Sequence, residues 1–259
     1  MRAASVTAVI LTKDEAAALP CALGSLPPGM PALVLDAEST DATPRIAEAF
    51  GARAIVRPWA GFVAARRYAL GEVRTPWTLM LDADESLDAA LREALAALPE
   101  EPREAGFRLA RTTSLCGRPV RGCGWGDERL LRLFRTAEAR LAAHPAAGGA
   151  ADLHERWEVD GPVADLGGRL AHDSYPTLAA YRSKFARYTT IEAAALHARA
   201  PGAAFAAALA RAALRLPWLF FGRAGWRDGW RGAFVSAASA VYPVVVRWKA
   251  LAYREGRLR

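Results

Sequence analysis

The sequence predicts an α/β fold in which a doubly wound, mostly parallel sheet is followed by a C-terminal helical extension. Apolar, β-branched segments alternate with segments of helical composition in the N-terminal half of the chain. Two of these apolar segments run directly into aspartates, and ligands of open α/β sheets bind at the carboxyl ends of the strands. Beyond residue 198 the chain becomes basic and rich in tryptophan, which sets this part apart from the sheet.

The elements of the predicted sheet follow one another along the chain. Runs of valine, isoleucine and leucine indicate strands, and the stretches between them have helical composition and capping residues such as Asp41 and Thr43. The expected strands are Ser5–Leu11, Ala32–Asp36, Ala52–Val56, Trp77–Leu81, Gly106–Arg111 and Arg129–Arg135. The expected helices are Glu15–Leu23, Thr43–Phe50, Gly61–Leu70, Leu87–Leu98 and Thr177–Arg199, and we expect a mobile loop over Ala137–Ala151.

Composition excludes several classes of protein. With 259 residues, 53% hydrophobic and 24% charged, the chain is globular. Cys21, Cys116 and Cys123 are an odd number without a close pair, so neither a disulfide framework nor a zinc site is indicated, and buried free thiols are expected. The N-terminal apolar run is too short for a signal peptide, so we expect a cytoplasmic protein.

The net charge of +7 is concentrated at one end of the chain. From Arg199 onward there are eleven Lys or Arg and two acids, a net of +9, whereas residues 1–198 hold 23 and 25, a net of −2. No nucleic-acid-binding motif accompanies the basic residues, so no nucleic-acid partner is expected. An anionic membrane surface is the partner that this charge distribution favours.

The stretch Trp77–Glu85 carries the strongest chemical signal. An apolar strand leads without a break into Asp82, Asp84 and Glu85, and two carboxylates two residues apart can point to the same side of extended backbone. Oxygen ligands of this kind suit Mg²⁺ or Mn²⁺ carrying a substrate diphosphate. The alternative is that Asp84, Glu85 and Ser86 cap the helix that begins near Leu87.

Four segments in order resemble family 2 glycosyltransferases of the GT-A fold, and most closely the branch that contains lipopolysaccharide core β-1,4-glucosyltransferases. These segments are Val9-Ile10-Leu11-Thr12-Lys13-Asp14-Glu15, Val34-Leu35-Asp36-Ala37-Glu38-Ser39-Thr40-Asp41, Pro58-Trp59-Ala60-Gly61-Phe62 with Arg66, and Leu81-Asp82-Ala83-Asp84-Glu85. The resemblance implies a GT-A domain over 1–175, with a nucleotide-sugar half at about 1–98 and an acceptor half at about 99–175. Residues 176–259 would form a basic amphipathic helical extension.

The resemblance also implies roles for individual residues. Thr12 and Asp36 would hold the nucleotide base, Arg66 would lie against the diphosphate or brace the acidic motif, and Asp82 would meet the ribose or the sugar. Asp84 would bind the metal, Mn²⁺ or Mg²⁺. Taken without the resemblance, Asp36 could cap the following turn, Thr12 could bond its own backbone, and Arg66 could lie on a solvated helix face.

Three positions depart from the family pattern. Asp14 stands where the family commonly has Asn, Ala37-Glu38 stands where Ser-Gly is usual, and Arg67 occupies a position that is often Asn. Because Glu38 replaces a glycine in a tight turn, the path of the loop beside the base is expected to change.

An inverting transfer also needs a carboxylate that takes the proton of the attacking hydroxyl. Glu155 is the first candidate because similar proteins carry a His-Glu pair at His154-Glu155, and Asp127 is the second. Glu155 could instead be an exposed acid paired with Arg156. His172 is expected to complete the metal shell, since a histidine from the C-terminal part does so in related enzymes, although a lone histidine is often structural.

The C-terminal extension has the composition of a membrane-contacting surface. Four of the eight tryptophans follow residue 217 and are interleaved with arginines. The apolar run Ala233–Val246, of about fourteen residues and broken by Pro243, is shorter than the roughly eighteen needed to cross a bilayer, so it should lie on the membrane. A helical lid on the core or a dimer interface is the alternative.

These observations together predict an inverting, metal-dependent glycosyltransferase. It would use a nucleoside-diphosphate sugar, most simply a UDP-sugar, and a lipopolysaccharide-core or other lipid-linked glycan acceptor at the cytoplasmic face of the membrane, where the enzyme would be peripheral. One alternative is transfer to polyisoprenyl phosphate or to a protein. Another is a catalytically silent nucleotide-sugar-binding membrane scaffold.

Overall fold

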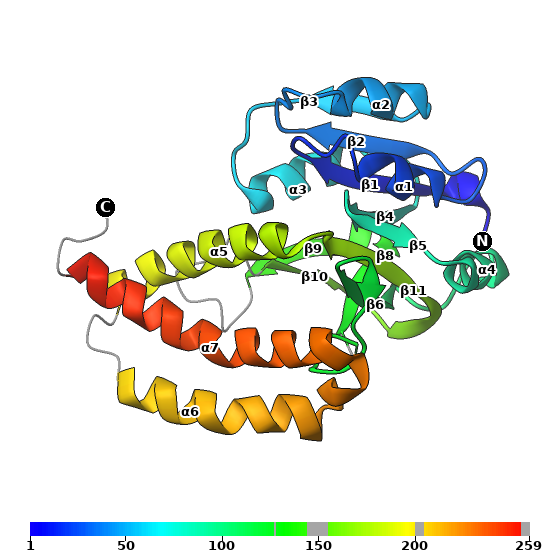
Figure 1. Cartoon of the computed structure of the whole chain (residues 1–259). Helices are drawn as coiled ribbons and strands as arrows, with labels where there is room; N and C mark the ends of the chain where they lie inside the picture. Colours follow the sequence, from blue (N-terminus) through cyan, green and yellow to red (C-terminus); the bar gives the residue numbers. More distant parts are fainter. Residues whose placement is uncertain (127, 144–154, 200–204, 255–259) are drawn as a thin grey trace. The chain divides into compact units, whose positions relative to one another are not determined.

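The computed structural model describes residues 1–126, 128–143, 155–199 and 205–254. These residues fall into two compact units. Unit 1 comprises 1–111, 128–143 and 155–173, and unit 2 comprises the described residues of 112–127 and 174–259. Figure 1 shows the elements along the chain.

Unit 1 is built on a sheet that is parallel on one side and antiparallel on the other. The parallel strands are β1 (Val6–Thr12), β2 (Ala32–Asp36), β3 (Arg53–Val56) and β4 (Trp77–Asp82). The others are β5 (Glu85–Leu87), β6 (Gly106–Leu115), β8 (Glu128–Arg135) and β11 (Val163–Tyr175), and the order is β3-β2-β1-β4-β8-β6-β11-β5, with β7 (Arg118–Pro119) beside β6. The topology confirms the predicted α/β fold and its mostly parallel first half.

Helices cover both faces of this sheet because alternate residues of the strands point to opposite sides. On β1, Val6 and Ile10 join one apolar cluster, with residues of α1 (Leu19–Gly24), α2 (Thr43–Ala49) and α4 (Ala89–Ala97). Val9 joins a second cluster with α3 (Phe62–Gly71) and with the hairpin of β9 (Ala139–Ala143) and β10 (Glu155–Val159). The sheet is therefore doubly wound, as predicted.

Unit 2 is mainly helical. Its helices are α5 (Leu178–Arg199), α6 (Phe205–Pro217) and α7 (Gly229–Arg254), with a π-helical turn Trp218–Gly222 and a 3₁₀ turn Gly225–Asp228 between α6 and α7. In this unit α7 packs against both α5 and α6 (Figure 1). Asp228 ties the turn to residues 121 and 122, because its carboxylate accepts the backbone N–H groups of Arg121 and Gly122.

The structure corrects four expectations at the level of elements. The helix predicted from Leu87 begins at Ala89, because Glu85–Leu87 pairs with β11 as β5, and the cap is Asp88, whose Oδ1 accepts the N–H of Leu91 at 2.7 Å. The first helix begins at Leu19 rather than Glu15, after a turn. Part of the expected loop over Ala137–Ala151 forms β9, and residues 144–154 lie outside the described part. Of the three free cysteines, Cys123 is buried but Cys21 is exposed.

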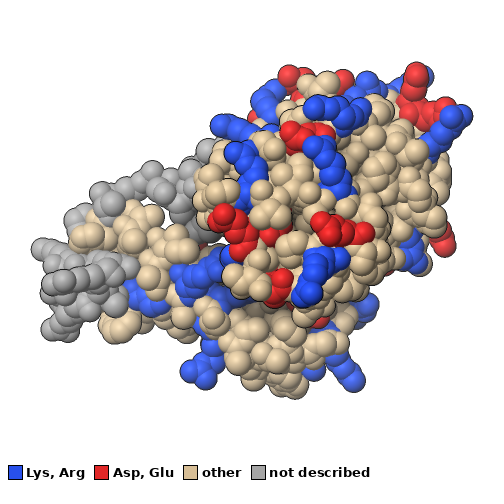
Figure 2. Space-filling view, turned by 90° about the horizontal axis from the view of Figure 1, so that it is seen from above, with Lys and Arg blue, Asp and Glu red and all other residues tan. Residues whose placement is uncertain are grey.

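Charges of both signs are mixed on the surface. On the face in Figure 2, Lys and Arg side chains lie beside Asp and Glu side chains. Residues 1–198, with 23 basic and 25 acidic residues, have nearly balanced charge, so neighbouring groups on the surface largely offset one another.

Candidate active site

The acidic residues predicted from the sequence lie at the carboxyl edge of the parallel strands. In the sheet register, Thr12 at the end of β1 lies opposite Asp36 at the end of β2. On the other side of β1, Leu11 lies opposite Asp82 at the end of β4. The strand order thus brings Thr12, Asp36 and Asp82 to one edge, which is the usual position of a ligand site in such sheets.

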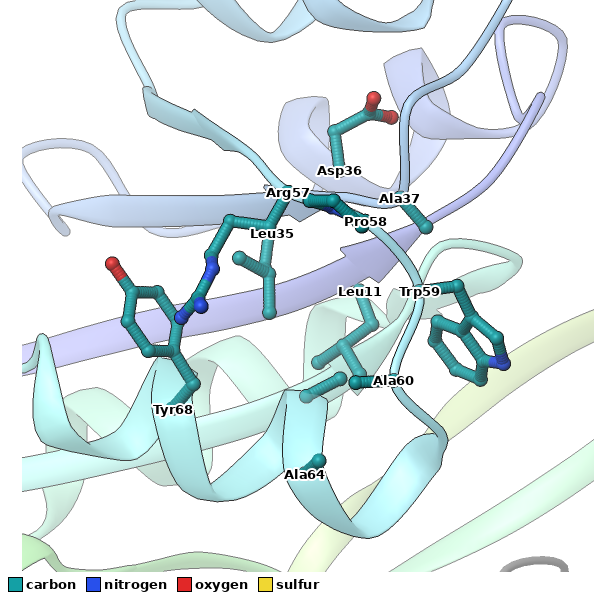
Figure 3. A pocket seen from close by; sticks show the side chains of 11 residues that line it. Leu11, Leu35, Asp36, Ala37, Arg57, Pro58, Trp59, Ala60, Ala64 and Tyr68 are labelled. Carbon is teal, nitrogen blue, oxygen red and sulfur yellow. The ribbon is translucent and has the colours of Figure 1, made fainter.

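Asp36 is held by hydroxyl and backbone donors. Its Oδ1 accepts the hydroxyls of Thr12 at 2.9 Å and Ser39 at 2.5 Å, and its Oδ2 accepts the backbone N–H of Ser39 at 2.7 Å. The side chain is fully buried, and in Figure 3 the carboxylate points away from Arg57 and Tyr68. Asp36 and Thr12 therefore fix the start of the loop that follows β2.

That loop departs from ordinary backbone geometry where the sequence departs from the family pattern. Asp14 and Glu38 have φ values of 54° and 57°, in the left-handed region that favours glycine and asparagine. The two loops that contain them are joined, because Asp14 accepts the N–H of Thr40 at 2.7 Å and the Lys13 ammonium donates to the carbonyl of Glu38 at 2.5 Å. Asp14 and Glu38 are exposed and lie in the two connected loops that follow β1 and β2.

A pocket of about 100 Å³ opens beside Asp36. Arg57 lies over the Tyr68 ring, with 3.9 Å from its guanidinium carbon to the ring centre, and Trp59 is half-exposed on the other side of the pocket (Figure 3). A planar guanidinium and two aromatic rings are suited to stacking against a flat, polar ring such as a nucleobase. The remaining lining is apolar and consists of Leu11, Leu35, Ala37, Pro58, Ala60, Ala64 and Ala65.

At the end of β4, arginines hold Asp82. Nη2 of Arg66 donates to Oδ1 at 3.1 Å, and Nη2 of Arg132 donates to Oδ2 at 2.6 Å. Burial alone would raise the pKa of Asp82, but the charges of Arg132 and Arg66 outweigh it and hold that pKa well below its usual range. Asp82 is therefore a permanent anion whose two oxygens are already engaged by cations.

Glu85 lies at the centre of the same network. Its side chain is fully buried, and Oε1 accepts from Arg132 at 2.8 Å and from Arg111 at 3.0 Å, while Oε2 accepts the backbone N–H of Asp82 at 3.1 Å. Arg111 also makes two bonds to Glu128, at 2.9 and 2.7 Å. The pKa values of Arg132 and Arg111 are raised, because the attraction of these carboxylates exceeds the cost of burial. Glu85 thus neutralises two arginines instead of capping a helix.

Asp84 has a different neighbour from Asp82. Nε2 of His172, on β11, lies 3.4 Å from Oδ1 of Asp84, and the backbone N–H of Asp173 donates to the carbonyl of Asp84 at 2.9 Å. The side chain of Asp84 is 17% exposed and that of His172 is 13% exposed. The pairing of β5 with β11, in which Glu85 lies opposite His172, creates this proximity between residues that are far apart in sequence.

This donor set fits a divalent cation that is completed by a substrate. Across the described residues no group of three or more His, Cys, Asp or Glu is arranged to hold a metal. Mg²⁺ and Mn²⁺ in diphosphate-handling sites need only one or two protein ligands, because phosphate oxygens and water supply the others. A carboxylate with a neighbouring imidazole satisfies this requirement and suits Mn²⁺ better than Mg²⁺.

The two candidates for the catalytic base fall at the limits of the description. Glu155 begins β10, where its backbone pairs with Ala143, but its side chain lies outside the described part. Asp127 and His154 lie outside the described residues altogether. Arg156 donates to Glu158 at 3.0 and 2.7 Å, and the predicted alternative, a pair of Glu155 with Arg156, lies outside the described side chains.

Sequence reasoning missed Arg111 and Arg132, the two arginines of the antiparallel strands. In the sequence they are two of several arginines in β6 and β8, and arginines in a strand usually indicate a solvated face, but Arg132 is buried. The available signal was the number of acids at the end of β4, because three carboxylates that close must be neutralised by cations from elsewhere.

The first half of the chain is similar to a known protein family. The model of the family "Glycosyl transferase family 2" matches residues 12–121, which include the loops of β1 and β2, Arg66 and the acids after β4. The match covers 110 of the 259 residues and supports an assignment of this part of the chain to that family. The resemblance noted in the motifs is confirmed.

Curated relatives of the family 2 domain match it to different extents. The lipopolysaccharide core biosynthesis glycosyltransferase LpsC of Rhizobium meliloti is 27% identical over 92% of this chain and 88% of its own length. An uncharacterized glycosyltransferase of Rickettsia bellii is 38% identical over 91 residues, and one of Rickettsia felis is 40% identical over 91 residues. The chain spans about a third of the length of these two Rickettsia proteins, 31% and 32%.

Solved structures give weaker likenesses. Residues 1–349 of TarS from S. aureus, solved with UDP-GlcNAc, align with a TM-score of 0.47 at 13% identity over 97% of this chain and 92% of that one. Glucosyl-3-phosphoglycerate synthase from Mycobacterium tuberculosis, solved with Mn²⁺ and UDP-glucose, aligns with a TM-score of 0.34 at 21% identity over 42% and 43%. The family assignment rests on the sequence matches and on the topology.

Proposed function

We propose that this protein transfers a sugar, with inversion, from a nucleoside-diphosphate sugar to a hydroxyl of a glycan acceptor, using a divalent cation. The observation that carries the proposal is that Oδ1 of Asp84, just after β4, lies 3.4 Å from Nε2 of His172. Asp82 and Glu85 are neutralised by Arg66, Arg111 and Arg132, while Asp84 lies beside His172. The family match supports transfer of a glycosyl group as the reaction.

The donor nucleotide would occupy the pocket beside Asp36. Arg57, Tyr68 and Trp59 offer planar groups for the base. The carboxylate of Asp36 is fully buried and points away from Arg57 and Tyr68, so Asp36 would hold the base by fixing the loop beside it. Thr12 would act by fixing Asp36, and Arg66, next to Asp82, would face the diphosphate.

Asp84 and His172 would hold the cation. When bound, it would supply positive charge to the departing diphosphate. The arginines that hold Asp82 and Glu85 leave these two carboxylates little capacity to compete for the cation. Asp82, 32% exposed and fixed by Arg66 and Arg132, would accept a hydroxyl of the ribose or the sugar.

The proton of the attacking hydroxyl would be taken by Glu155, with Asp127 as the second candidate. Attack by an acidic phosphate needs little help from a base. Glu155→Gln should therefore lower the rate of transfer to a sugar hydroxyl by about 10²–10⁴-fold. The rate of transfer to polyisoprenyl phosphate should be nearly unchanged. If the variant changes both transfer rates by the same factor relative to the parent, Glu155 is excluded as the base.

The acceptor class is proposed from LpsC, whose name assigns it to lipopolysaccharide core biosynthesis. A lipid-linked acceptor requires the enzyme to reach the cytoplasmic face of a membrane, and α6 is suited to that contact. In the described residues, Phe205–Gly222 is long and apolar enough to cross a membrane by length and composition, and 11% of it is buried. Arg211 and Arg215 lie in its middle, where a spanning helix would bury their charges at a cost of about 2.5–3.5 kcal/mol each, so we place it in the plane of the interface.

We therefore propose α6 as the membrane-contacting segment, whereas the sequence predicted the run 233–246. In α7, the side chains of Val235, Ala240 and Val246 are buried in unit 2. Around α6, exposed apolar side chains and arginines occur together without an acid. Charge-removing substitution of Arg211 and Arg215 together should weaken binding to anionic vesicles, and unchanged binding would contradict the placement.

The central test is the response of donor turnover to Asp84. Asp84→Asn should lower Mn²⁺-dependent hydrolysis of a nucleoside-diphosphate sugar by about 10²-fold or more, while the fold is retained. Asp173→Asn is the matched control, because it removes an exposed carboxylate next to His172. Equal turnover in the parent and in Asp84→Asn would refute the metal assignment.

A catalytically silent nucleotide-sugar binder remains the competing function. It would bind the nucleotide, as detected by thermal stabilisation, without Mn²⁺-dependent turnover of any donor. The Asp84–His172 pair favours the enzyme, because a carboxylate next to an imidazole is a ligand set for a divalent cation.

A further inference from the structure

Unit 2 contains a pocket of about 220 Å³ that the donor chemistry does not use. Helix α5 contributes Tyr181, Phe185 and Tyr188 at steps of four and three, so these three rings share one helix face. Helix α7 contributes Tyr242, and Arg215 in the last turn of α6 also lines the pocket. All the residues that line it belong to unit 2.

The rings form a connected aromatic wall. Trp125 stacks on Tyr175 with centroids 5.5 Å apart and planes 25° apart, and Tyr175 contacts Tyr181 at 4.9 Å. Phe185 meets Tyr242 edge to face at 5.3 Å. Rings that pack against one another in this way lose little further freedom when a ligand arrives, which makes them good binding surfaces.

The wall is amphipathic rather than purely apolar. Four of its rings are tyrosines, and Ser239 adds an aliphatic hydroxyl. A hydrocarbon chain in such a pocket would strip water from these hydroxyls without replacing the hydrogen bonds. A sugar ring presents C–H groups to an aromatic face and hydroxyls at its edge, so it matches both features.

Charge around the pocket favours an anion. Arg215 lines it, and the Lys184 ammonium lies 5.5 Å from the centre of the Tyr175 ring. Glu192 is the nearby acid, and its Oε1 accepts the Tyr242 hydroxyl at 2.8 Å. A guanidinium at the edge of an aromatic pocket is suited to a carboxylate or a phosphate group.

We propose that this pocket binds one sugar residue that carries a carboxylate or phosphate group, as a subsite for the acceptor glycan. The ring would lie against the aromatic wall and its anionic group against Arg215. A volume of about 220 Å³ is below the roughly 300–1,000 Å³ of sites for drug-sized ligands, which fits a single sugar ring of a longer glycan. The proposal rests on the glycosyltransferase function proposed above and specifies its acceptor.

Ligand-observed NMR of the full chain, without donor or metal, tests the pocket directly. The probes are glucuronate, glucose 6-phosphate and uncharged glucose, and octyl glucoside tests for a hydrocarbon site. We expect the two anionic sugars to bind at least about tenfold more tightly than glucose, and Arg215→Gln to remove this preference. Whichever anionic sugar binds more tightly identifies the group as carboxylate or phosphate.

Arg211→Gln is the matched control, because Arg211 is an exposed arginine one turn earlier on α6 that does not line the pocket. It should leave the preference for anionic sugars unchanged. Equal loss in both variants would overturn the proposal, as would equal binding of all three sugars, no binding of any of them, or preference for octyl glucoside through its alkyl chain.

A readout in unit 1 separates this proposal from the proposed function. Nucleotide-sugar binding and its dependence on Asp84 should be the same in Arg215→Gln and in the parent. If the donor is bound and hydrolysed but anionic sugars show no preference, the acceptor subsite is wrong and the transferase function stands. If anionic sugars bind but no donor does, the transferase function fails and the pocket is a sugar-binding site of another kind.

Discussion

The two units treat their buried polar groups in opposite ways. In unit 1, Glu85 is buried as an ion and Asp82 is partly buried as an ion, each is held by arginines, and the pKa of Asp82 is lowered by those partners. In unit 2, Tyr181 and Cys123 are buried as neutral groups, and removal from water raises the pKa of both. One unit is therefore organised by charge pairing and the other by desolvation.

These two kinds of burial suit two kinds of ligand. A site for a diphosphate and a cation needs fixed charges that stay ionised, and paired arginines and carboxylates supply them. A site for the polyol part of an acceptor needs flat rings and hydroxyls that stay neutral. The two kinds of burial predict that the units respond differently to mutation and to pH.

The largest effect should come from removing the central cation of unit 1. Arg132 is 5% exposed and bridges Asp82 and Glu85, so Arg132→Met leaves a buried and a partly buried carboxylate without their shared partner. We expect a loss of about 3–5 kcal/mol in the free energy of unfolding, measured by urea titration. Arg129→Met is the control on the same strand, because the Arg129–Asp165 pair is about half exposed and should contribute only about 0–1 kcal/mol.

A result in which both variants lose the same stability would remove the contrast between buried and exposed pairs. The expected difference depends on burial and not on the number of contacts. Salt should also discriminate between them, because screening weakens the exposed pair more than the buried one.

The next effect is on the acid side and belongs to unit 1. Burial raises the pKa of Asp82, but the charges of Arg132 and Arg66 lower it by more. The pKa values of Asp14 and Asp41 are lowered chiefly by hydrogen bonds from Thr40 and Thr43. A lowered carboxyl pKa stabilises the fold above the unfolded value of 3.8, and this stability is lost as the pH falls through the folded value. Urea titrations of the metal-free protein below pH 4 should show stability falling with pH.

Asp82→Asn sharpens this prediction. The variant lacks one titrating group, so the slope of stability against pH below pH 4 should decrease by about 1.4 kcal/mol per pH unit. An unchanged slope would mean that Asp82 is not the anion that the arginines hold. The comparison is made in the presence of a chelator, so that a bound cation does not contribute.

The third effect is on the alkaline side and belongs to unit 2. Burial raises the pKa of Tyr181 to about 12, above its ordinary value of 10.0. The unfolded phenol ionises first, so stability is full below pH 10 and falls between pH 10 and 12. Between pH 8 and pH 11 the parent should therefore lose about 1 kcal/mol more free energy of unfolding than Tyr181→Phe loses. Urea titrations of both proteins at the two pH values measure this difference.

Sequence patterns predicted the sheet because strand and helix periods are local properties. The four parallel strands and Asp36 and Asp82 at their ends needed no information from elsewhere in the chain. The arginine network was not predictable in this way. Arg111 and Arg132 reach Glu85 only because β6 and β8 return antiparallel beside β4, and short-range patterns contain no information on that pairing.

The pair of Asp84 and His172 shows the same limit. Asp84 was predicted from its own strand, whereas the position of His172 depended on the family resemblance, since 88 positions separate the two residues in the sequence. The pairing of β5 with β11 brings them within 3.4 Å. The alternative in which Asp84, Glu85 and Ser86 cap a helix is wrong, because Glu85–Leu87 forms β5, which is too short for a strand signal, and Asp88 is the cap.

The smallest effect concerns Glu38, which stands where the family pattern has glycine and adopts a backbone conformation that favours glycine. The residue is exposed with φ at 57°, a conformation that costs a residue with Cβ about 1–2 kcal/mol, and its carbonyl accepts from Lys13 whatever the side chain. Because glycine adds chain entropy to the unfolded state, Glu38→Gly should stabilise unit 1 by a net of only about 0.5–1 kcal/mol. Glu38→Ala retains Cβ and should give no gain in the same thermal unfolding measurement, so equal stabilisation by both variants would attribute the effect to the lost charge instead of the backbone.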